Sequence, residues 1–361
     1  MCMARKKGKK GLLQKARKRG KIPARKAARK PVYLSDEMRQ STSYEEVLLN
    51  SIISKGKPNE IPECALIFNS VLSGLTPAMR NLHYKSGISA GRLLYRIYQR
   101  ERRYTWYEES VADLVRFFEN AGFSRVSYSI MPERISIKFH NCDRSNLGAN
   151  LHTFEAGMVS GFLTAGKEQQ VQMAEVSCSS NGSEFCHFAS ELPSAQQKIR
   201  ETALLEGLAE RVKAEAESSK DGRQHFSEEY YLLGSASLTK SEYASEMNKI
   251  IYYMGGMIGS SLGLNTAKLR RSGKKLERLF SLLNLCSMKV KGTSPLACEM
   301  QFNSLKAKKE FVDISISFLN GLLKGYATES KTIHSSIAKR NGRYIVRVTE
   351  GNKKGDYKNK G

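Results

Sequence analysis

Residues 152–188, HTFEAGMVSGFLTAGKEQQVQMAEVSCSSNGSEFCHF, decide the fold of this chain. The stretch begins with Phe154, Gly157 and Gly161, whose spacing of about one helical turn predicts a helix. Two runs in which apolar and polar residues alternate, QQVQMAEVSC and EFCHFA, follow and are separated by an Asn181-Gly182 turn. This order predicts a helix followed by a β-hairpin.

The expected hairpin carries three side chains with metal-binding atoms, Glu175, Cys178 and Cys186. Cys178 and Cys186 flank the turn, so two antiparallel strands can bring their sulfur atoms together. Two thiolates beside a carboxylate form a donor set that zinc accepts. The hairpin therefore predicts a metal site, although two reduced cysteines without a metal would have the same spacing.

The amino-terminal segment 1–31 is strongly basic and is expected to be a disordered tail. It contains fourteen Lys and Arg residues and no acid, which is more than half of the chain's net charge of +24. We expect these cations to contact phosphates of RNA, DNA or the ribosome, while a solubilising tail or a weaker contact with an anionic membrane are the alternatives. The contact residues would be Arg5, Lys6, Lys7, Lys9, Lys10, Lys15, Arg17, Lys18, Arg19, Lys21, Arg25, Lys26, Arg29 and Lys30.

The segment 42–190 predicts one α+β domain. Helices are expected over 42–54, 62–100 and 106–121. Thr42 would cap the first helix, with Val47 towards its apolar side, and Gly122 would end the third. Two alternating runs, FSRVSYSIM and RISIKFH, then predict antiparallel strands ahead of the 152–188 stretch. Helices and hairpins in this order predict helices packed on an antiparallel sheet.

A charged helix over 194–220 is expected to link this domain to a second one, 226–350, which repeats the first. In the repeat, MGGMIGSSL at 254–262 matches SGISAGRLL at 86–94, and residues 317–348 align without a gap on 157–188. The alignment places Gly255 on Gly87, Gly259 on Gly91, Gly321 on Gly161 and Gly342 on Gly182. The two domains are expected to pack as an intramolecular pseudo-dimer, followed by a short basic tail over 351–361.

The repeat keeps the scaffold and loses the metal-binding side chains. Ser335 falls on Glu175, Ala338 on Cys178, Val346 on Cys186 and Val312 on His152. None of these replacements is a good zinc ligand. Only the first domain is therefore expected to hold a metal.

The 152–188 stretch resembles the carboxy-terminal half of the 4-vinyl reductase domain. The pattern of that family is Cys-x-aromatic-x-x-Gly-x-x-x-Gly, then Glu-x-x-Cys, a glycine turn and Cys-x-aromatic. The chain matches it at Phe154, Gly157, Gly161, Glu175, Cys178, Gly182, Cys186 and Phe188. It departs from the pattern at the first position, where His152 replaces the cysteine. The resemblance covers about residues 65–190 and, in degenerate form, 228–350.

The resemblance implies a helical layer on an antiparallel sheet, as in TRAPP vesicle-tethering subunits and bacterial aromatic-sensing regulators. It also implies dimerisation, an apolar pocket for a small molecule, and zinc at the Glu-Cys-Cys cluster with Glu175 as an oxygen ligand. The fourth ligand is either His152, at the first cysteine position of the family, or Cys142, in the loop after RISIKFH. A bound zinc ion would be structural, tying the last hairpin to the helix over 154–164.

These features favour a non-enzymatic protein that binds or senses an apolar small molecule, with structural zinc in its first domain. The alternative is a nucleic-acid- or ribosome-associated scaffold that is bound through its basic tail. No dinucleotide or HExxH motif is present, no catalytic constellation stands out, and four protein ligands would close the zinc ion to substrate. The residues of the ligand pocket stay open, because the stripe Leu93, Leu94, Tyr95 and Ile97 fits a pocket lining or a plain core.

The chain is expected to be cytoplasmic. No apolar run has the length of a transmembrane helix, and the basic amino terminus lacks the apolar segment of a signal peptide. We therefore expect reduced cysteines, which disfavours a disulfide between Cys178 and Cys186. A homodimer is a further expectation from the resemblance.

Overall fold

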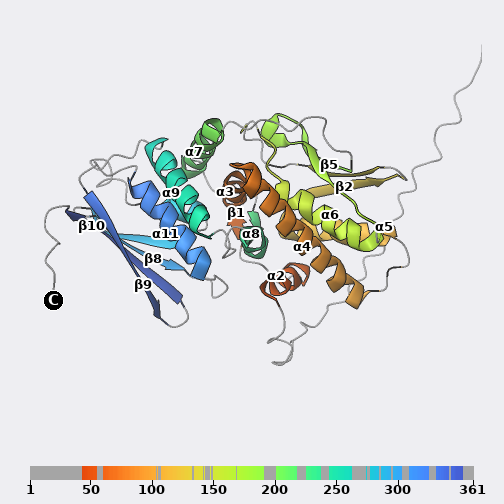
Figure 1. Ribbon diagram of the computed structural model, residues 1–361, viewed down its shortest axis with the longest axis horizontal. Coiled ribbons are helices and arrows are strands. Elements are labelled where there is room, and N and C mark those ends of the chain that lie inside the picture. The colour runs from red at the N-terminus through yellow and green to blue at the C-terminus, as the bar shows by residue number, and fades with distance from the viewer. Residues whose placement is uncertain are drawn as a thin grey trace, which may run out of the picture. The chain divides into compact units, whose positions relative to one another are not determined.

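The structure is a computed structural model of the chain (Figure 1). It describes residues 43–54, 60–102, 104, 107–131, 134–140, 142, 147, 149–167, 169–190, 201–217, 225–236, 244–261, 274, 277–283, 286–293, 296–302, 309–324, 331–340 and 343–352. The basic segment expected over 1–31 lies outside the described residues, as does 353–361 of the expected carboxy-terminal tail.

The first half of the chain alternates helices with two β-hairpins. Its helices are α2 (Tyr44–Ile53), α3 (Glu63–Gly74), α4 (Pro77–Glu101), α5 (Tyr107–Ala121) and α6 (Thr153–Lys167). Its strands are β1 (Glu60–Pro62), β2 (Arg125–Ile130), β3 (Ile135–His140), β4 (Ala174–Ser177) and β5 (Phe185–Ala189), with the 3-10 turn η1 (Ser179–Asn181) before β5. The α+β class expected from the sequence is therefore confirmed.

Three details of the helices differ from expectation. Ser43, and not Thr42, caps α2, because its hydroxyl accepts a hydrogen bond from the first turn of the helix. Val47 is 44% exposed, so it lies outside the apolar side of α2. The helical stretch expected over 62–100 is interrupted at Thr76, which has an extended backbone and caps α4 with its hydroxyl.

Strands β2 to β5 form one antiparallel sheet in the order β2-β3-β5-β4. One of its faces carries side chains that are buried in the core, including Ile137, Phe139 and Phe188. Helix α5 contacts β2, and α6 contacts β4. The sheet therefore has one face in the core, while the opposite face carries the alternate, more polar side chains.

Helices α4 and α6 lie against each other at their glycines (Figure 1). A Cβ atom on Gly87 would overlap the carbonyl oxygen of Phe154, and one on Gly157 would overlap the carbonyl oxygen of Tyr84. Gly91 makes the same kind of approach to Met158. Backbones this close need glycine on both helices, and the contact leaves no room for a ligand between them.

The second half of the chain contains a second hairpin pair. Its helices are α7 (Glu201–Glu217), α8 (Glu228–Ser235), α9 (Ala244–Ser261) and α11 (Lys309–Lys324), and residues 277–282 are also helical. Its strands are β6 (His225–Ser227), β7 (Ser287–Thr293), β8 (Leu296–Phe302), β9 (Lys331–Arg340) and β10 (Arg343–Asn352). The first two residues of the expected carboxy-terminal tail therefore belong to β10.

The second sheet repeats the first in strand order and in register. Its order is β7-β8-β10-β9, which is the order of the first sheet with each strand replaced by its counterpart. Ser335 pairs with Val348 just as Glu175 pairs with Phe188, in agreement with the gapless alignment. Helices α9 and α11 also pack through a glycine, since a Cβ atom on Gly255 would overlap the backbone of α11.

Helix α7 and the short elements after it pack against both halves. Leu204, Leu205 and Leu208 of α7 are buried, and the helix contacts α3 and α9. Strand β6 pairs antiparallel with β1, with Phe226 opposite Ile61. Helix α8 contacts α2, α3 and α4. In the described part of the chain, no helix combines the length and the apolar character needed to cross a bilayer.

Candidate metal centre

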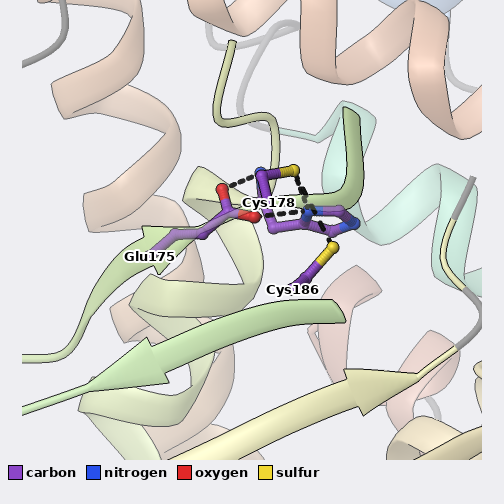
Figure 2. Close-up of side chains that lie close together, drawn as sticks. Glu175, Cys178 and Cys186 are labelled. Carbon is purple, nitrogen blue, oxygen red and sulfur yellow. Dashed lines mark hydrogen bonds and ion pairs between the residues drawn. The ribbon is translucent and has the colours of Figure 1, made fainter. Parts of the chain in front are cut away.

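The structure brings together the four residues expected to bind metal. Glu175 lies on β4, Cys178 follows that strand directly, and Cys186 lies on β5. Figure 2 shows these three side chains pointing towards one another. His152 immediately precedes α6, and one donor atom from each of the four residues lies within 4.8 Å of the other three.

The turn between β4 and β5 places the two cysteines side by side. The carbonyl oxygen of Cys178 accepts hydrogen bonds from the amides of Asn181 and Ser183, at 3.0 and 3.1 Å. Gly182 has a φ of 85°, a left-handed conformation that glycine adopts without strain. The expected Asn181-Gly182 turn is therefore present, and it folds the chain back so that Cys186 faces Cys178.

The spacing of the sulfur and nitrogen atoms fits a tetrahedral zinc ion. The sulfurs of Cys178 and Cys186 are 3.8 Å apart, and the Cys178 sulfur lies 3.6 Å from Nδ1 of His152. In a tetrahedron with zinc–sulfur bonds of about 2.3 Å and zinc–nitrogen bonds of about 2.0 Å, these separations would be about 3.8 and about 3.5 Å. The Cys178 sulfur therefore already lies at zinc-ligand separations from both the Cys186 sulfur and the His152 nitrogen.

Glu175 is hydrogen-bonded to His152 through both of its carboxylate oxygens. Oε1 lies 2.8 Å from Nδ1 of His152, and Oε2 accepts the backbone N–H of His152 at 2.9 Å. The Asn150 side chain donates to the backbone oxygen of Glu175 at 2.8 Å. Two atoms that bind one zinc ion would be about 3.4 Å apart, so direct coordination by both Oε1 and Nδ1 requires the proton between them to leave.

Two serines of η1 direct polar groups at the sulfurs. The backbone N–H of Ser179 donates to the Cys186 sulfur at 3.4 Å, and its hydroxyl lies 3.2 Å from the same atom. The Ser180 hydroxyl lies 2.8 Å from the Cys178 sulfur and donates to the carbonyl oxygen of Ala149 at 3.0 Å. The N–H of Ser179 stabilises a thiolate at Cys186, which is the form that binds metal, whereas the Ser180 hydroxyl gives its hydrogen to Ala149 and offers the Cys178 thiol only a lone pair.

The electrostatics of the cluster favour a thiolate next to an imidazolium. Hydrogen bonds from Cys142 and Cys178 lower the pKa of the Cys186 thiol far below its usual value. Burial acts to lower the pKa of His152, but the negative charges of Cys186, Glu175 and Cys178 outweigh it and hold this pKa well above its usual value. A metal ion must therefore displace a proton from His152 as well as from a thiol.

Cys142, the alternative fourth ligand, lies next to the cluster. Its thiol is buried, donates to the carbonyl oxygen of Phe139 at 3.7 Å, and interacts with Cys186 and His152. It does not belong to the group whose donor atoms all lie within 4.8 Å of one another. Of the two residues left open by the sequence, His152 is the one that the structure places among the other three ligands.

The second sheet has no counterpart of this cluster. Ser335 occupies the strand position of Glu175, and Val346 occupies that of Cys186. Cys286 and Cys298 lie in this half as free thiols, and Cys178 and Cys186 are free thiols as well. Within the described residues, the cluster around His152 is the only group of three or more His, Cys, Asp or Glu side chains spaced to hold a metal ion.

A buried acid that the sequence analysis did not single out lies beside the metal centre. Glu155 of α6 is buried, and burial raises the pKa of its carboxyl. The Tyr230 hydroxyl of α8 donates to Oε1 of Glu155 at 2.9 Å, whereas Oε2 has no hydrogen-bond partner among the described residues. The acid in the otherwise apolar run FEAGMVSGFL was the only sequence signal for it.

Glu155 and the metal centre share a small cavity. The cavity measures about 30 Å³ and is lined by Leu66, Ile67, Ser70, Phe123, Cys142, Leu151, His152, Glu155, Ser180 and Phe226. This volume suits one or two water molecules, and an apolar cavity that binds benzene is about five times larger. The space beside the centre is therefore small and partly polar.

The stripe considered for a ligand pocket lies in the core. Leu94 and Ile97 are buried, and Leu93 and Tyr95 are partly buried against the same apolar cluster. The Tyr95 ring packs edge-on against Phe162 of α6, with ring centroids 5.2 Å apart. These contacts are those of packing residues between α4 and α6.

Comparison with models of protein families, with curated proteins and with solved structures finds no match to this chain.

Proposed function

We propose that the chain is a zinc-binding protein in which His152, Glu175, Cys178 and Cys186 hold one structural metal ion. The observation that carries the proposal is the convergence of these four donors from β4, β5 and the start of α6 within 4.8 Å. Two thiolates, an imidazole and a carboxylate suit zinc in both charge and softness. When bound, zinc would supply a cross-link between the last hairpin and α6.

The surroundings of the four residues support a structural rather than a catalytic role. Cys178 and Cys186 are fully buried, and Glu175 is nearly so. Four protein ligands fill a tetrahedral zinc ion, which leaves no position for a substrate. Other groups of the chain then act by orientation, with Oε2 of Glu175 holding the backbone N–H of His152 and Ser179 directing its N–H at Cys186.

The metal content of the purified chain tests this proposal. Protein made without chelators should contain one zinc per chain by elemental analysis, and Cys178→Ser should lose the metal and melt at a lower temperature. Cys286→Ser is the matched control, because Cys286 is a free thiol in the second half, away from the cluster. Absence of zinc from the unaltered chain, or equal zinc in both variants, would refute the proposal.

Binding of an apolar small molecule remains our proposal for the wider role of the chain, and it rests on the resemblance to the 4-vinyl reductase domain. The cavity beside the metal centre offers apolar walls from Leu66 and Phe226 next to the polar groups of His152 and Glu155. At about 30 Å³ it must widen to admit a hydrocarbon. Thermal shift with aromatics, fatty acids and isoprenoids tests the role, since a ligand of the folded state raises the melting temperature, whereas no shift with any compound would count against it.

The alternative role, nucleic-acid binding through the basic tail, is favoured by the fourteen cations without an acid in residues 1–30. Deletion of residues 1–31 should remove most of the salt-dependent affinity for RNA or DNA and leave the melting temperature unchanged. Equal salt-dependent binding by the shortened chain would exclude this role.

The pairing of β1 with β6 supports the proposal of an intramolecular pseudo-dimer. Each strand leads directly into a helix, α3 or α8, and the two strands run antiparallel with Ile61 opposite Phe226. Two copies of one unit related by a twofold axis would make such a contact. If the internal pairing takes the place of a homodimer, light scattering should show that the chain is a monomer in solution.

A further inference from the structure

The outer face of the first sheet, the one opposite the core, carries rings and cations without an acid. On this face Arg125, His140 and Phe185 form one row across three strands, and Ser127, Lys138 and His187 form the next. The only acid in the four strands is Glu175, which pairs with Phe188 on the core face. A strand face in contact with water usually mixes both signs of charge, so this composition points to an anionic partner.

The rings on the outer face cluster around Phe185. The centroids of the His140 and His187 rings lie 5.8 and 6.2 Å from that of Phe185. The Lys138 ammonium lies 4.3 Å from the centroid of the Phe185 ring. All four side chains are partly exposed. A flat group stacking on Phe185 would displace the ammonium, which then lies within reach of that group's negative charge.

Serine hydroxyls fix the two imidazoles in place. The Ser127 hydroxyl lies 2.8 Å from Nε2 of His140, and the Ser136 hydroxyl lies 2.8 Å from Nε2 of His187. These bonds join β2 to β3 and β3 to β5 across the outer face. The rings are thus held in set orientations before any partner binds, which reduces the entropy lost on binding.

We propose that this outer face binds single-stranded RNA. Some four-stranded antiparallel sheets bind single-stranded RNA by stacking unpaired bases on exposed rings while nearby cations contact the phosphates. Phe185 supplies the stacking ring, with Lys138 and Arg125 for phosphates. The serine hydroxyls and imidazole nitrogens are suited to the 2′-hydroxyl groups that distinguish RNA from DNA.

The second sheet provides an internal comparison. At the same strand positions it has Ile345 where the first sheet has Phe185, and Glu299 where the first has Lys138. Glu299 is bound to Lys291 at 2.8 Å and lies 3.6 Å from Arg347, so the cations of that face are already neutralised in part. At these paired positions of the described strands, a ring lies beside a lysine on the first sheet and not on the second.

The inference depends neither on zinc nor on the basic tail, and the experiment separates it from both. Full-length chain is titrated into a labelled single-stranded RNA of about twelve nucleotides in about 0.5 M NaCl, which weakens phosphate contacts of the tail more than base stacking. Fluorescence anisotropy gives the affinity. Ultraviolet crosslinking followed by mass spectrometry gives the contact residues.

Phe185→Leu should weaken RNA binding about tenfold, the loss expected when one stacked base is removed. Lys138→Gln should weaken RNA binding as well. This second variant tests the proposal if Phe185→Leu lowers the melting temperature. Ile345→Leu, the matched change on the second sheet, should bind like the unaltered chain. Crosslinks should fall on β3 and β5, and DNA of the same sequence should bind more weakly.

Unchanged affinity in both outer-face variants would overturn the inference. Crosslinks confined to residues 1–31, equal loss in Ile345→Leu, or equal affinity for DNA would overturn it too.

Discussion

Glu175 binds one residue, His152, through both of its carboxylate oxygens, at 2.8 Å to Nδ1 and 2.9 Å to the backbone N–H. The pair joins β4 to the residue before α6, although the two are 23 positions apart in the chain. Glu175 thereby fixes the position and the ring orientation of the imidazole. The candidate ligands are thus held in place in the absence of a metal, which would limit the entropy lost if one binds.

Replacing Glu175 by Gln should weaken zinc binding by at least about 10- to 100-fold, because the change removes a charged ligand as well as a group that orients His152. A glutamine side chain has one acceptor and cannot accept both bonds from His152. Competition with a chromogenic chelator gives the affinity. Glu184→Gln, an exposed change in the same hairpin, is the control and should bind zinc normally; equal affinities for the two variants would contradict this role of Glu175.

Zinc affinity should fall as the pH is lowered from about 8 to about 6, because protons compete with the metal for the imidazole and the thiols. His152 has a pKa well above its usual value, since the negative charges of Cys186, Glu175 and Cys178 outweigh burial. Its proton is therefore still bound near neutral pH and must leave when zinc binds. Calorimetry in buffers of different ionisation enthalpy should show proton release, and binding without any release would be inconsistent with His152 as a ligand.

The free energy of unfolding of the unaltered chain should decrease as the pH rises, and Glu155→Gln should reduce this decrease. Burial raises the pKa of Glu155, so the folded state holds this proton more tightly than the unfolded state. The carboxyl contributes most below its unfolded pKa, and the contribution is lost as the pH rises through the folded value. Gln keeps an acceptor for the Tyr230 hydroxyl.

Urea unfolding at several pH values measures this effect. The free energy of unfolding of the unaltered chain should fall more steeply between about pH 5 and pH 8 than that of Glu155→Gln. Identical slopes for the two proteins would show that Glu155 has the same pKa in both states.

Gly87→Ala should destabilise the chain by about 1–3 kcal/mol or more, because the added Cβ atom would overlap the backbone of Phe154 on α6. Gly256→Ala is the matched control. Its Cβ atom would lie 3.6 Å from the nearest atom, and alanine favours a helix interior by up to about 1 kcal/mol over glycine. Thermal unfolding of both variants checks the contrast, and equal stability would mean that α4 and α6 do not touch.

Local patterns predicted most of the elements, because helix spacing, strand alternation and the Asn181-Gly182 turn act over a few residues. The repeat alignment agrees with the register of the second hairpin, where Ser335 lies opposite Val348 as Glu175 lies opposite Phe188. The break at Thr76 was missed because apolar periodicity continues through it, although Gly74 at the end of α3 and Pro77 in the first turn of α4 mark the interruption. The Thr76 hydroxyl binds a backbone N–H of α4, which starts a new helix although the helical pattern of the sequence continues on both sides.

Relationships between distant segments could not be predicted. Nothing in the sequence places Tyr230 opposite Glu155, 75 positions away, since that contact depends on how α8 docks against α6. The choice between His152 and Cys142 was open for the same reason. The outer face of the first sheet was missed because its rings and cations occupy the outward-facing positions of ordinary alternating strands. Only the pairing of β3 with β5 brings Lys138 next to Phe185.

The most direct test of the metal centre is X-ray absorption at the zinc edge of the purified full-length chain. The account predicts one zinc ion with two sulfur ligands at about 2.3 Å and two nitrogen or oxygen ligands at about 2.0 Å. Cys178→Ser should abolish the signal of bound zinc, and Cys286→Ser should leave the spectrum unchanged. Three or more sulfur ligands would place Cys142 in the coordination sphere and contradict the ligand set, and a chain without zinc would contradict the site itself.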